Sequence, residues 1–114
     1  MTTLYGIPNC DTIKKARKWL NDNGIEYRFH DYKKQGLDKA LLRTWIDEIG
    51  WEALLNRRGT TWRKLPQAVR DGIDEESAIR VMLENPSIIR RPVLESEEQR
   101  HVGFSEQAYQ ELFL

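Results

Sequence analysis

The chain of 114 residues contains a single cysteine, Cys10. One cysteine cannot form a disulfide within the chain, and such sparing use of cysteine is typical of proteins from a reducing compartment. The sequence also lacks an apolar run long enough to cross a membrane, and its N-terminus lacks the apolar stretch of a signal peptide. We therefore expect a cytoplasmic protein.

Net charge is also absent, because eighteen basic and eighteen acidic residues cancel. Without a surplus of positive charge, the composition gives no indication of direct nucleic-acid or membrane binding. A glycine-rich phosphate loop is missing. The two histidines, His30 and His101, show no recognised metal-ligand spacing and alternate with apolar neighbours, which favours half-buried structural side chains. We therefore expect neither a metal nor a bound cofactor.

Hydrophobic periodicity predicts the order of the helices and strands. The first part should contain a strand over residues 2–7, a helix of about thirteen residues from Asp11 that stops at 23–24, and a strand over 25–32. The middle should contain a helix over 37–49, a short helical segment over 51–56, a loop opening at 59–61 and a second short segment over 62–69 that is interrupted by Pro66. A helix capped by Asp74 should follow and stop at 85–86. The last part should contain a strand over 87–94, a charged turn at 95–99, a strand over 100–104 and a helix from Ser105.

This order is βαβ, then a helical block, then ββα. It corresponds to an α/β, thioredoxin-like fold with helices inserted between its two halves. The first two strands should be parallel and joined by a right-handed crossover. Because the chain has no linker or internal repeat, we expect one domain over 1–114 with a helical insertion over about 37–85.

Cys10 stands where the first strand ends and the first helix begins. Unpaired amides and the positive end of the helix dipole lie at such a junction, and both favour a thiolate over a thiol. Lys14, Lys15 and Arg17 add positive potential. The alternative is that Cys10 is a small buried hydrophobic residue, as most single intracellular cysteines are.

Three motifs in this order are similar to one known family. They are YGIPNCDT with KKA within residues 5–16, LLNRRGT at 54–60 and IIRRPV at 88–93. Together they resemble the arsenate reductase (ArsC), Spx and YffB family over essentially the whole chain, and its YffB members most of all. The resemblance implies a thioredoxin-like fold with a helical insertion, a nucleophilic Cys10, and a cis-proline, Pro92, that packs beside the cysteine.

The resemblance also indicates how a substrate is held. Arg91 matches an anion-binding arginine of the arsenate reductases. Arg58 lies near a second family arginine, which by strict count from residues 54–55 falls at Asn56. For these arginines the alternative is a solvated basic surface, which is what most arginine pairs are. The predicted substrate-binding residues are Arg91, Arg58, Pro92, Asn9, Asp11 and Thr12.

The chain departs from the family in two places. Arsenate reductases of this type carry a third arginine in the last hairpin, where residues 103–104 are Gly-Phe. The loss of one arginine costs about 1.5–3 kcal/mol of charged hydrogen bonding to an oxyanion, so arsenate reduction should be weak or absent. Spx often carries a second cysteine three residues after the first. That position is Ile13 here, so turnover should be monothiol.

The sequence thus favours a monothiol, glutathione-dependent thiol oxidoreductase in which Cys10 forms a mixed disulfide. Glutathione, as a co-substrate, or a glutaredoxin should resolve that disulfide, and we expect a monomer. Two alternatives remain open. One is an Spx-like regulator that binds RNA polymerase through the inserted helices without a dithiol switch. The other is a true glutaredoxin-coupled arsenate reductase.

Overall fold

The computed structural model describes residues 1–97 and 99–114. The charged turn that was expected at 95–99 therefore contains one residue, Glu98, that lies outside the described residues. The expected turn was too long, because the strands on its two sides extend to Ser96 and begin again at Gln99.

The chain divides into two compact units, of which the first combines Met1–Gln35 with Arg91–Leu114 and the second is Gly36–Arg90. Each unit contains its own set of buried apolar side chains. The expectation that they form one domain, with an insertion over about 37–85, stays a prediction.

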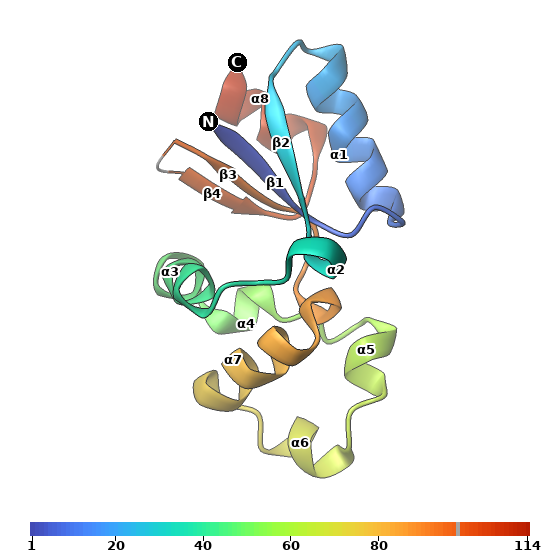
Figure 1. The fold of residues 1–114 in the computed structure, drawn as a ribbon, viewed down its shortest axis with the longest axis vertical. Helices are drawn as coiled ribbons and strands as arrows, with labels where there is room; N and C mark the ends of the chain where they lie inside the picture. Colours follow the sequence, from blue (N-terminus) through green and yellow to red (C-terminus); the bar gives the residue numbers. More distant parts are fainter. Residues whose placement is uncertain (98) are drawn as a thin grey trace. The chain divides into compact units, whose positions relative to one another are not determined.

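The first unit is built around a mixed sheet with the strand order β2-β1-β3-β4 (Figure 1). Its strands are β1 (Thr2–Gly6), β2 (Tyr27–Asp31), β3 (Val93–Ser96) and β4 (Gln99–Val102). β1 and β2 are parallel, as predicted. β3 runs antiparallel to both β1 and β4, so the sheet joins a βαβ half to a ββα half.

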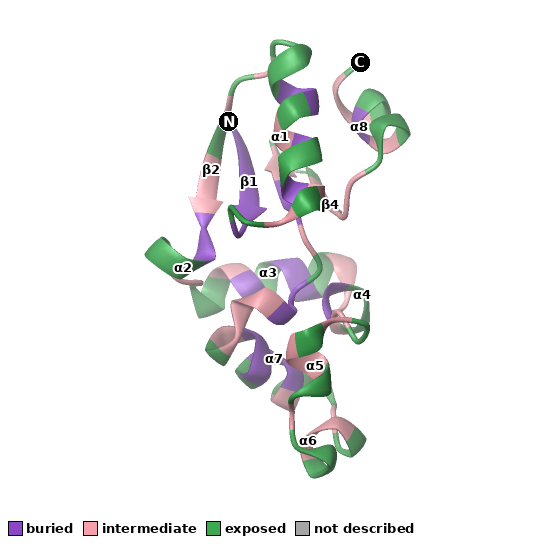
Figure 2. Ribbon diagram, turned by 90° about the vertical axis from the view of Figure 1, so that its right-hand side faces the viewer, coloured by how far each residue is buried: buried purple, intermediate pink, exposed green. Residues whose placement is uncertain are grey.

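One face of this sheet is covered by α1 (Asp11–Asp22) and α8 (Glu106–Phe113). Leu4 of β1 and Leu94 of β3 are direct cross-strand partners, so they point to the same side of the sheet. There they belong to a core cluster with residues of both helices. The buried members are Leu4, Ala16, Trp19, Leu20, Leu94 and Tyr109. Figure 2 shows the resulting division of α1 into a buried side and an exposed side.

The helix boundaries of this unit follow local sequence signals. Asn23 is the C-cap of α1, and Gly24, with φ 66°, provides the left-handed conformation that ends the helix, as predicted. Ser105 is the N-cap of α8, and its Oγ accepts a hydrogen bond of 3.1 Å from the amide of Ala108. The predicted start of this helix is therefore confirmed.

Ser105→Ala should lower the free energy of unfolding by about 1 kcal/mol, because the capping oxygen is lost and an amide of the first turn is left without it. Chemical denaturation followed by circular dichroism measures this change. Ser105→Asp, which keeps an acceptor at the same position, is the matched control and should retain most of the stability. An alanine variant as stable as the wild type would contradict the assigned cap.

The second unit is helical. Its elements are α3 (Lys39–Ile49), α4 (Trp51–Leu54), α5 (Thr60–Arg63), α6 (Gln67–Asp71), α7 (Glu75–Glu84) and the 3-10 turn η1 (Pro86–Ile88). α3 and α4 both pack against α7. Asp74 caps α7 as predicted, and it forms a capping box in which Asp74 and Ser77 each accept the other's backbone amide through their side chains. The C-cap of α7 is Asn85, which confirms the predicted stop.

Two predicted boundaries are wrong. Residue 32 does not end β2 but begins the short helix α2 (Tyr32–Gln35), because Asp31 Oδ1 accepts the amide of Lys33 at 2.9 Å and turns the chain. The loop expected at 59–61 is instead the start of α5. The interruption expected at Pro66 is confirmed, because α5 and α6 lie on its two sides and proline has no amide hydrogen to donate.

The strand expected over 87–94 is also wrong in its first half. The amides of Ile88 and Ile89 donate to the carbonyls of Asn85 and Pro86, which closes the 3-10 turn η1. Beyond it, Ile89 forms only an isolated bridge to Leu55 within the second unit. Strand β3 starts at Val93, after the proline.

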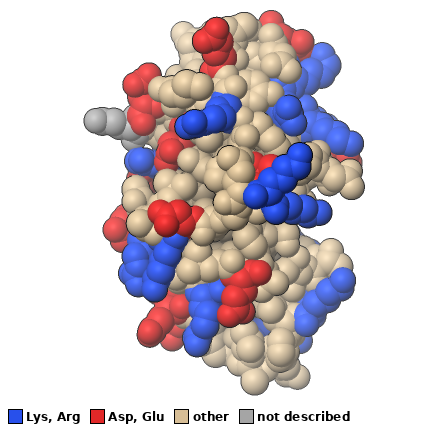
Figure 3. Space-filling view, viewed as in Figure 1, with Lys and Arg blue, Asp and Glu red and all other residues tan. Residues whose placement is uncertain are grey.

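Charged side chains of both signs are interspersed on the face drawn in Figure 3. Within residues 1–97 and 99–114, no helix has both the length and the apolar character that crossing a membrane requires.

Candidate functional site

Cys10 is the N-cap residue of α1, with an extended backbone at φ −142° and ψ 127°. Its carbonyl accepts the amide of Lys14 at 3.0 Å, which is the first hydrogen bond of the helix. The residue is half-buried, and among the described residues its side chain makes no capping hydrogen bond. The amides of the first turn are therefore not satisfied by a capping side chain, and the positive end of the helix remains available beside the sulfur.

A close contact joins the end of β1 to the first turn of α1. A Cβ atom on Gly6 would overlap Cδ1 of Ile13 and would lie 3.1 Å from its Cγ1. Ile13 is fully buried. The glycine therefore allows α1 to approach β1 closely, and this approach places Cys10 at the carboxyl end of the strand, where open α/β sheets locate their sites.

Gly6→Ala should lower the free energy of unfolding by about 1–3 kcal/mol, because the added methyl group overpacks this contact. Ile13→Val removes the overlapping Cδ1 and should by itself cost about 0.5–1.5 kcal/mol. The double variant should be destabilised by less than the sum of the two single changes, because valine makes room for the new methyl group. Chemical denaturation of the four proteins gives the coupling, and strictly additive costs would contradict the contact.

Pro92 lies at the same end of the sheet. The Arg91–Pro92 peptide bond is cis, which is the isomer that the family resemblance implied. Pro92 is buried, and its carbonyl accepts the amide of Gly103 at 2.8 Å. Val93 is the cross-strand partner of Tyr5 in the antiparallel pair, so the start of β3 lies beside the end of β1. The topology thus brings the segment 91–92 and the loop that leads to Cys10 to the same end of the sheet.

Tyr32 lies at this end of the sheet as well, and it was not among the predicted site residues. The preceding residue, Asp31, is paired with Gly6 at the end of β1. Tyr32 is only 4% exposed, and its ring stacks on that of Tyr5 with centroids 6.4 Å apart and an angle of 26°. Burial raises the pKa of Tyr32 and Tyr5 adds to the increase, whereas the positive charge of Arg91 opposes it. The sequence signal for the helix that starts at Tyr32 is Asp31, because aspartate is a preferred N-cap residue.

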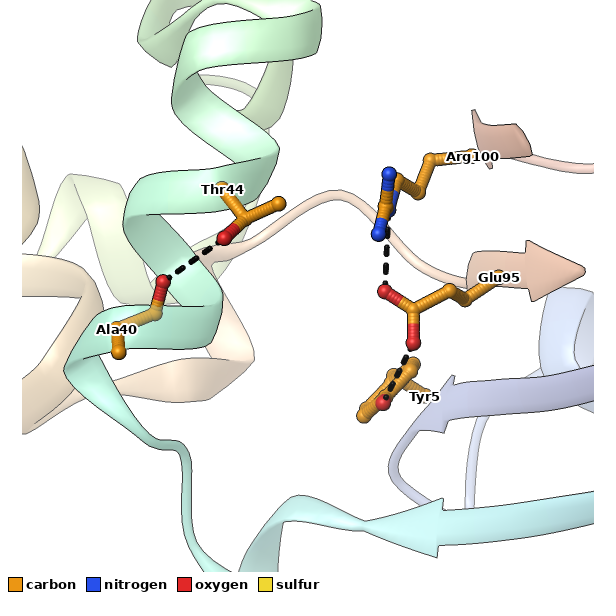
Figure 4. Close-up of polar contacts among 5 residues, drawn as sticks. All are labelled: Tyr5, Ala40, Thr44, Glu95 and Arg100. Atoms are coloured by element: carbon orange, nitrogen blue, oxygen red, sulfur yellow. Dashed lines mark hydrogen bonds and ion pairs between the residues drawn. The ribbon is translucent and has the colours of Figure 1, made fainter. Parts of the chain in front are cut away.

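Polar side chains meet on the sheet face opposite α1 and α8. The Tyr5 hydroxyl donates to Glu95 Oε1 at 3.2 Å, and Arg100 Nε donates to Glu95 Oε2 at 3.1 Å (Figure 4). Burial, followed by the neighbouring Glu95 carboxylate, raises the pKa of Tyr5 to about 12. Tyr5 therefore stays protonated at neutral pH and continues to donate to Glu95.

The remaining predicted substrate-binding residues are divided between the units. Asn9 and Asp11 are exposed, while Thr12 and Arg91 are half-buried, and all four belong to the first unit. Arg58 is exposed and belongs to the second unit. The roles of all these residues in substrate binding stay predictions.

Arg58 is held in a turn between α4 and α5. Its amide donates to Asn56 Oδ1 at 3.0 Å, and its carbonyl accepts Arg63 Nη2 at 2.9 Å. The preceding Arg57 lies over the ring of Trp62, with its guanidinium carbon 5.4 Å from the centroid. The two neighbouring arginines therefore have different surroundings.

The histidines are half-buried, as expected for structural side chains: His30 lies in β2 and His101 in β4. Burial lowers the pKa of His101, which favours its neutral form. Within the part of the chain that the structure describes, His, Cys, Asp and Glu side chains form no group of three that could hold a metal ion.

With the geometry in place, comparison with known proteins decides the family. The model of the ArsC family matches residues 5–112. The chain belongs to the ArsC family. The resemblance found in the three sequence motifs is therefore confirmed, and the predicted α/β, thioredoxin-like fold is confirmed by solved ArsC-family structures.

Solved structures and a curated relative place the chain within this family. A YffB protein is 50% identical, covers 97% of both chains and has a TM-score of 0.94. An arsenate reductase (ArsC) related protein from Brucella melitensis is 54% identical over 98% of this chain and 93% of its own, with a TM-score of 0.79. The global transcriptional regulator Spx of Listeria innocua is 30% identical over 93% of this chain and 82% of its own.

Proposed function

We propose that this ArsC-family protein is a monothiol, glutathione-dependent thiol oxidoreductase. The observation that carries the proposal is the position of its only cysteine. Cys10 is the N-cap residue of α1 and follows the carboxyl end of β1, at the end of the sheet where the Arg91–Pro92 segment also lies. Helix-end amides and the helix dipole stabilise a thiolate at such a position, and the thiolate is the nucleophilic form.

The proposed substrate is a mixed disulfide between glutathione and another thiol. The Cys10 thiolate attacks the glutathione sulfur, so a Cys10–glutathione disulfide forms and the other thiol leaves as a thiolate that takes a proton from solvent. A second glutathione, as its thiolate, attacks the glutathione sulfur of that intermediate. Oxidised glutathione is released and the Cys10 thiolate is restored. The cycle needs one protein thiol, which is what the chain provides.

The residues around Cys10 have distinct proposed roles. Arg91 binds a carboxylate of glutathione, because a planar guanidinium offers two parallel donors. Pro92 presents its neighbouring backbone groups to the extended substrate, and the loop residues 9–12 contact the substrate close to the sulfur.

Titration with reduced glutathione, followed by NMR, tests the binding part of this proposal. Amide resonances of residues 9–12 and of 91 and 93 should shift and saturate together, and Arg91→Ala should weaken the interaction. Shifts confined to other parts of the chain, or an unchanged spectrum, would refute glutathione as the co-substrate.

A second candidate function is an Spx-like regulator that binds RNA polymerase. The 30% identity to the Spx regulator of Listeria innocua favours it. Ile13 occupies the position of the second cysteine of the Spx dithiol switch and packs against β1 instead, so such a regulator here would lack that switch. Retention of purified RNA polymerase by the immobilised protein, with unchanged binding after Cys10→Ser, would support this candidate over the enzyme.

Arsenate fits the site less well than a glutathione disulfide. Gly103 stands where arsenate reductases of this type carry a third arginine, and its φ of 86° is a conformation that other residues rarely adopt. A replacement arginine there would have space for its Cβ but a strained backbone. An arsenate oxyanion would therefore lack the hydrogen bonds of this third arginine. The backbone conformation at Gly103 does not readily accommodate an arginine.

A further inference from the structure

The hydroxyl of Tyr32 is a buried polar group without a hydrogen-bond partner among the described residues. Burying a hydroxyl unpaired destabilises the folded chain, because its hydrogen bonds to water are lost and not replaced. Such a group in a native protein calls for an explanation, and pairing with a bound substrate is one that can be tested.

The surroundings of this hydroxyl indicate which chemical group it would bind. Tyr32 directly follows β2, whose last residue, Asp31, is the partner of Gly6 at the end of β1. Arg91 lies on the other side of β1, two residues before Val93, the partner of Tyr5. The positive charge of Arg91 acts on the Tyr32 hydroxyl. A neutral donor and a cationic donor therefore flank the strand that leads to Cys10, and together they suit an anion.

We propose that the Tyr32 hydroxyl and the Arg91 guanidinium bind the same carboxylate of the glutathione substrate, which makes Tyr32 a substrate-binding residue. This inference rests on the proposed function. In this proposal the Tyr32 hydroxyl, which is buried in the free protein, becomes accessible when the carboxylate binds at Arg91. Tyr32 then donates one hydrogen bond and Arg91 donates up to two, which fills acceptor positions on both carboxylate oxygens.

Tyr109 provides a matched control within the same unit. Its hydroxyl is also buried and also lacks a hydrogen-bond partner among the described residues. Burial raises the pKa of Tyr109. Its ring packs edge-on against Trp19 and Phe104 in the core cluster that contains Leu4, whereas Tyr32 stacks on Tyr5, which points to the opposite face of the sheet. Tyr109→Phe therefore removes a comparable hydroxyl without removing a donor to an anion.

The test compares the wild type, Tyr32→Phe and Tyr109→Phe by calorimetric titration with two probes. One probe is reduced glutathione, and the other is its diethyl ester, in which both carboxylates are neutral. Tyr32→Phe should bind glutathione about ten-fold or more weakly, the loss expected for a hydrogen bond to a charged group. It should bind the ester as the wild type does. Tyr109→Phe should bind both probes as the wild type does.

Thermal unfolding provides the control for structural damage. Both phenylalanine variants should unfold at or above the wild-type midpoint, because each removes an unpaired buried hydroxyl. The double variant Tyr32→Phe with Arg91→Ala should lose less affinity for glutathione than the product of the two single losses, since both donors act on one carboxylate.

The possible outcomes separate this inference from the proposed function. If the wild type binds glutathione and Tyr32→Phe binds it equally well, the role of Tyr32 is wrong and the proposed function stands. If Tyr32→Phe weakens both probes equally, the hydroxyl does not act on a carboxylate, and the inference is also wrong. If the wild type binds neither probe, the glutathione-dependent function fails and the role of Tyr32 fails with it.

Discussion

Cys10→Ser should abolish turnover of a mixed disulfide between glutathione and a small thiol. A serine hydroxyl is nearly isosteric with the thiol but is a far weaker nucleophile without an adjacent base, so the first displacement does not occur. The release of oxidised glutathione, measured with a coupled reductase, should fall to the rate observed without protein. Stability should be unchanged or slightly higher, because serine is a preferred N-cap residue and α1 has no capping side chain at this position.

Cys10→Ala is the matched control, since it removes the nucleophile and provides no new capping oxygen. It should lose turnover to the same extent as serine and should not gain stability. Turnover that survives in both variants would contradict the account, because the chain has no second cysteine that could take over the displacement.

Trp45→Ala should lower the free energy of unfolding by about 3–5 kcal/mol, the range for removing a large aromatic side chain from a packed core. Trp45 is fully buried in α3 and is among the largest completely buried side chains of the protein. Small domains are stable by only about 5–15 kcal/mol, so this one change removes a large share of the total. Urea denaturation followed by circular dichroism at helical wavelengths measures it.

Thr44→Ala, at the neighbouring position of α3, is the control for this experiment. Thr44 is exposed, and its Oγ1 donates to the carbonyl of Ala40 within the same helix at 3.1 Å (Figure 4). Alanine has a higher helix propensity than threonine, so this change should leave stability within about 0.5 kcal/mol. A small effect of Trp45→Ala, similar to that of Thr44→Ala, would contradict the complete burial of the Trp45 side chain.

The parts of the fold that the sequence predicted well depend on local signals. β1, α1 and α8 combine a clear hydrophobic period with a cap or stop residue, such as Ser105 or Gly24, and these signals need no information from distant residues. The strand expected over 87–94 failed because its fate depends on tertiary partners. Ile89 bridges to Leu55, and only the residues after Pro92 pair with β1.

The candidate site shows the same division between local and distant information. The junction at Cys10 was visible from a strand and a helix that adjoin in the sequence. Arg91 and Pro92 were predicted from the family resemblance, because no local sequence pattern shows that they lie beside the carboxyl end of β1. Asp31 is a local signal for the helix that starts at Tyr32, but the burial of the Tyr32 hydroxyl and the nearby charge of Arg91 arise only from the folded sheet.

The most direct test of the central claim is to trap the intermediate. The protein is mixed with a mixed disulfide of glutathione and a small thiol, with no free glutathione present, and is then measured by intact mass spectrometry. The account predicts one glutathione bound per chain through Cys10, release of the small thiol in equal amount, and loss of the adduct when free glutathione is added. An unmodified protein, or an adduct that carries the small thiol instead of glutathione, would contradict it.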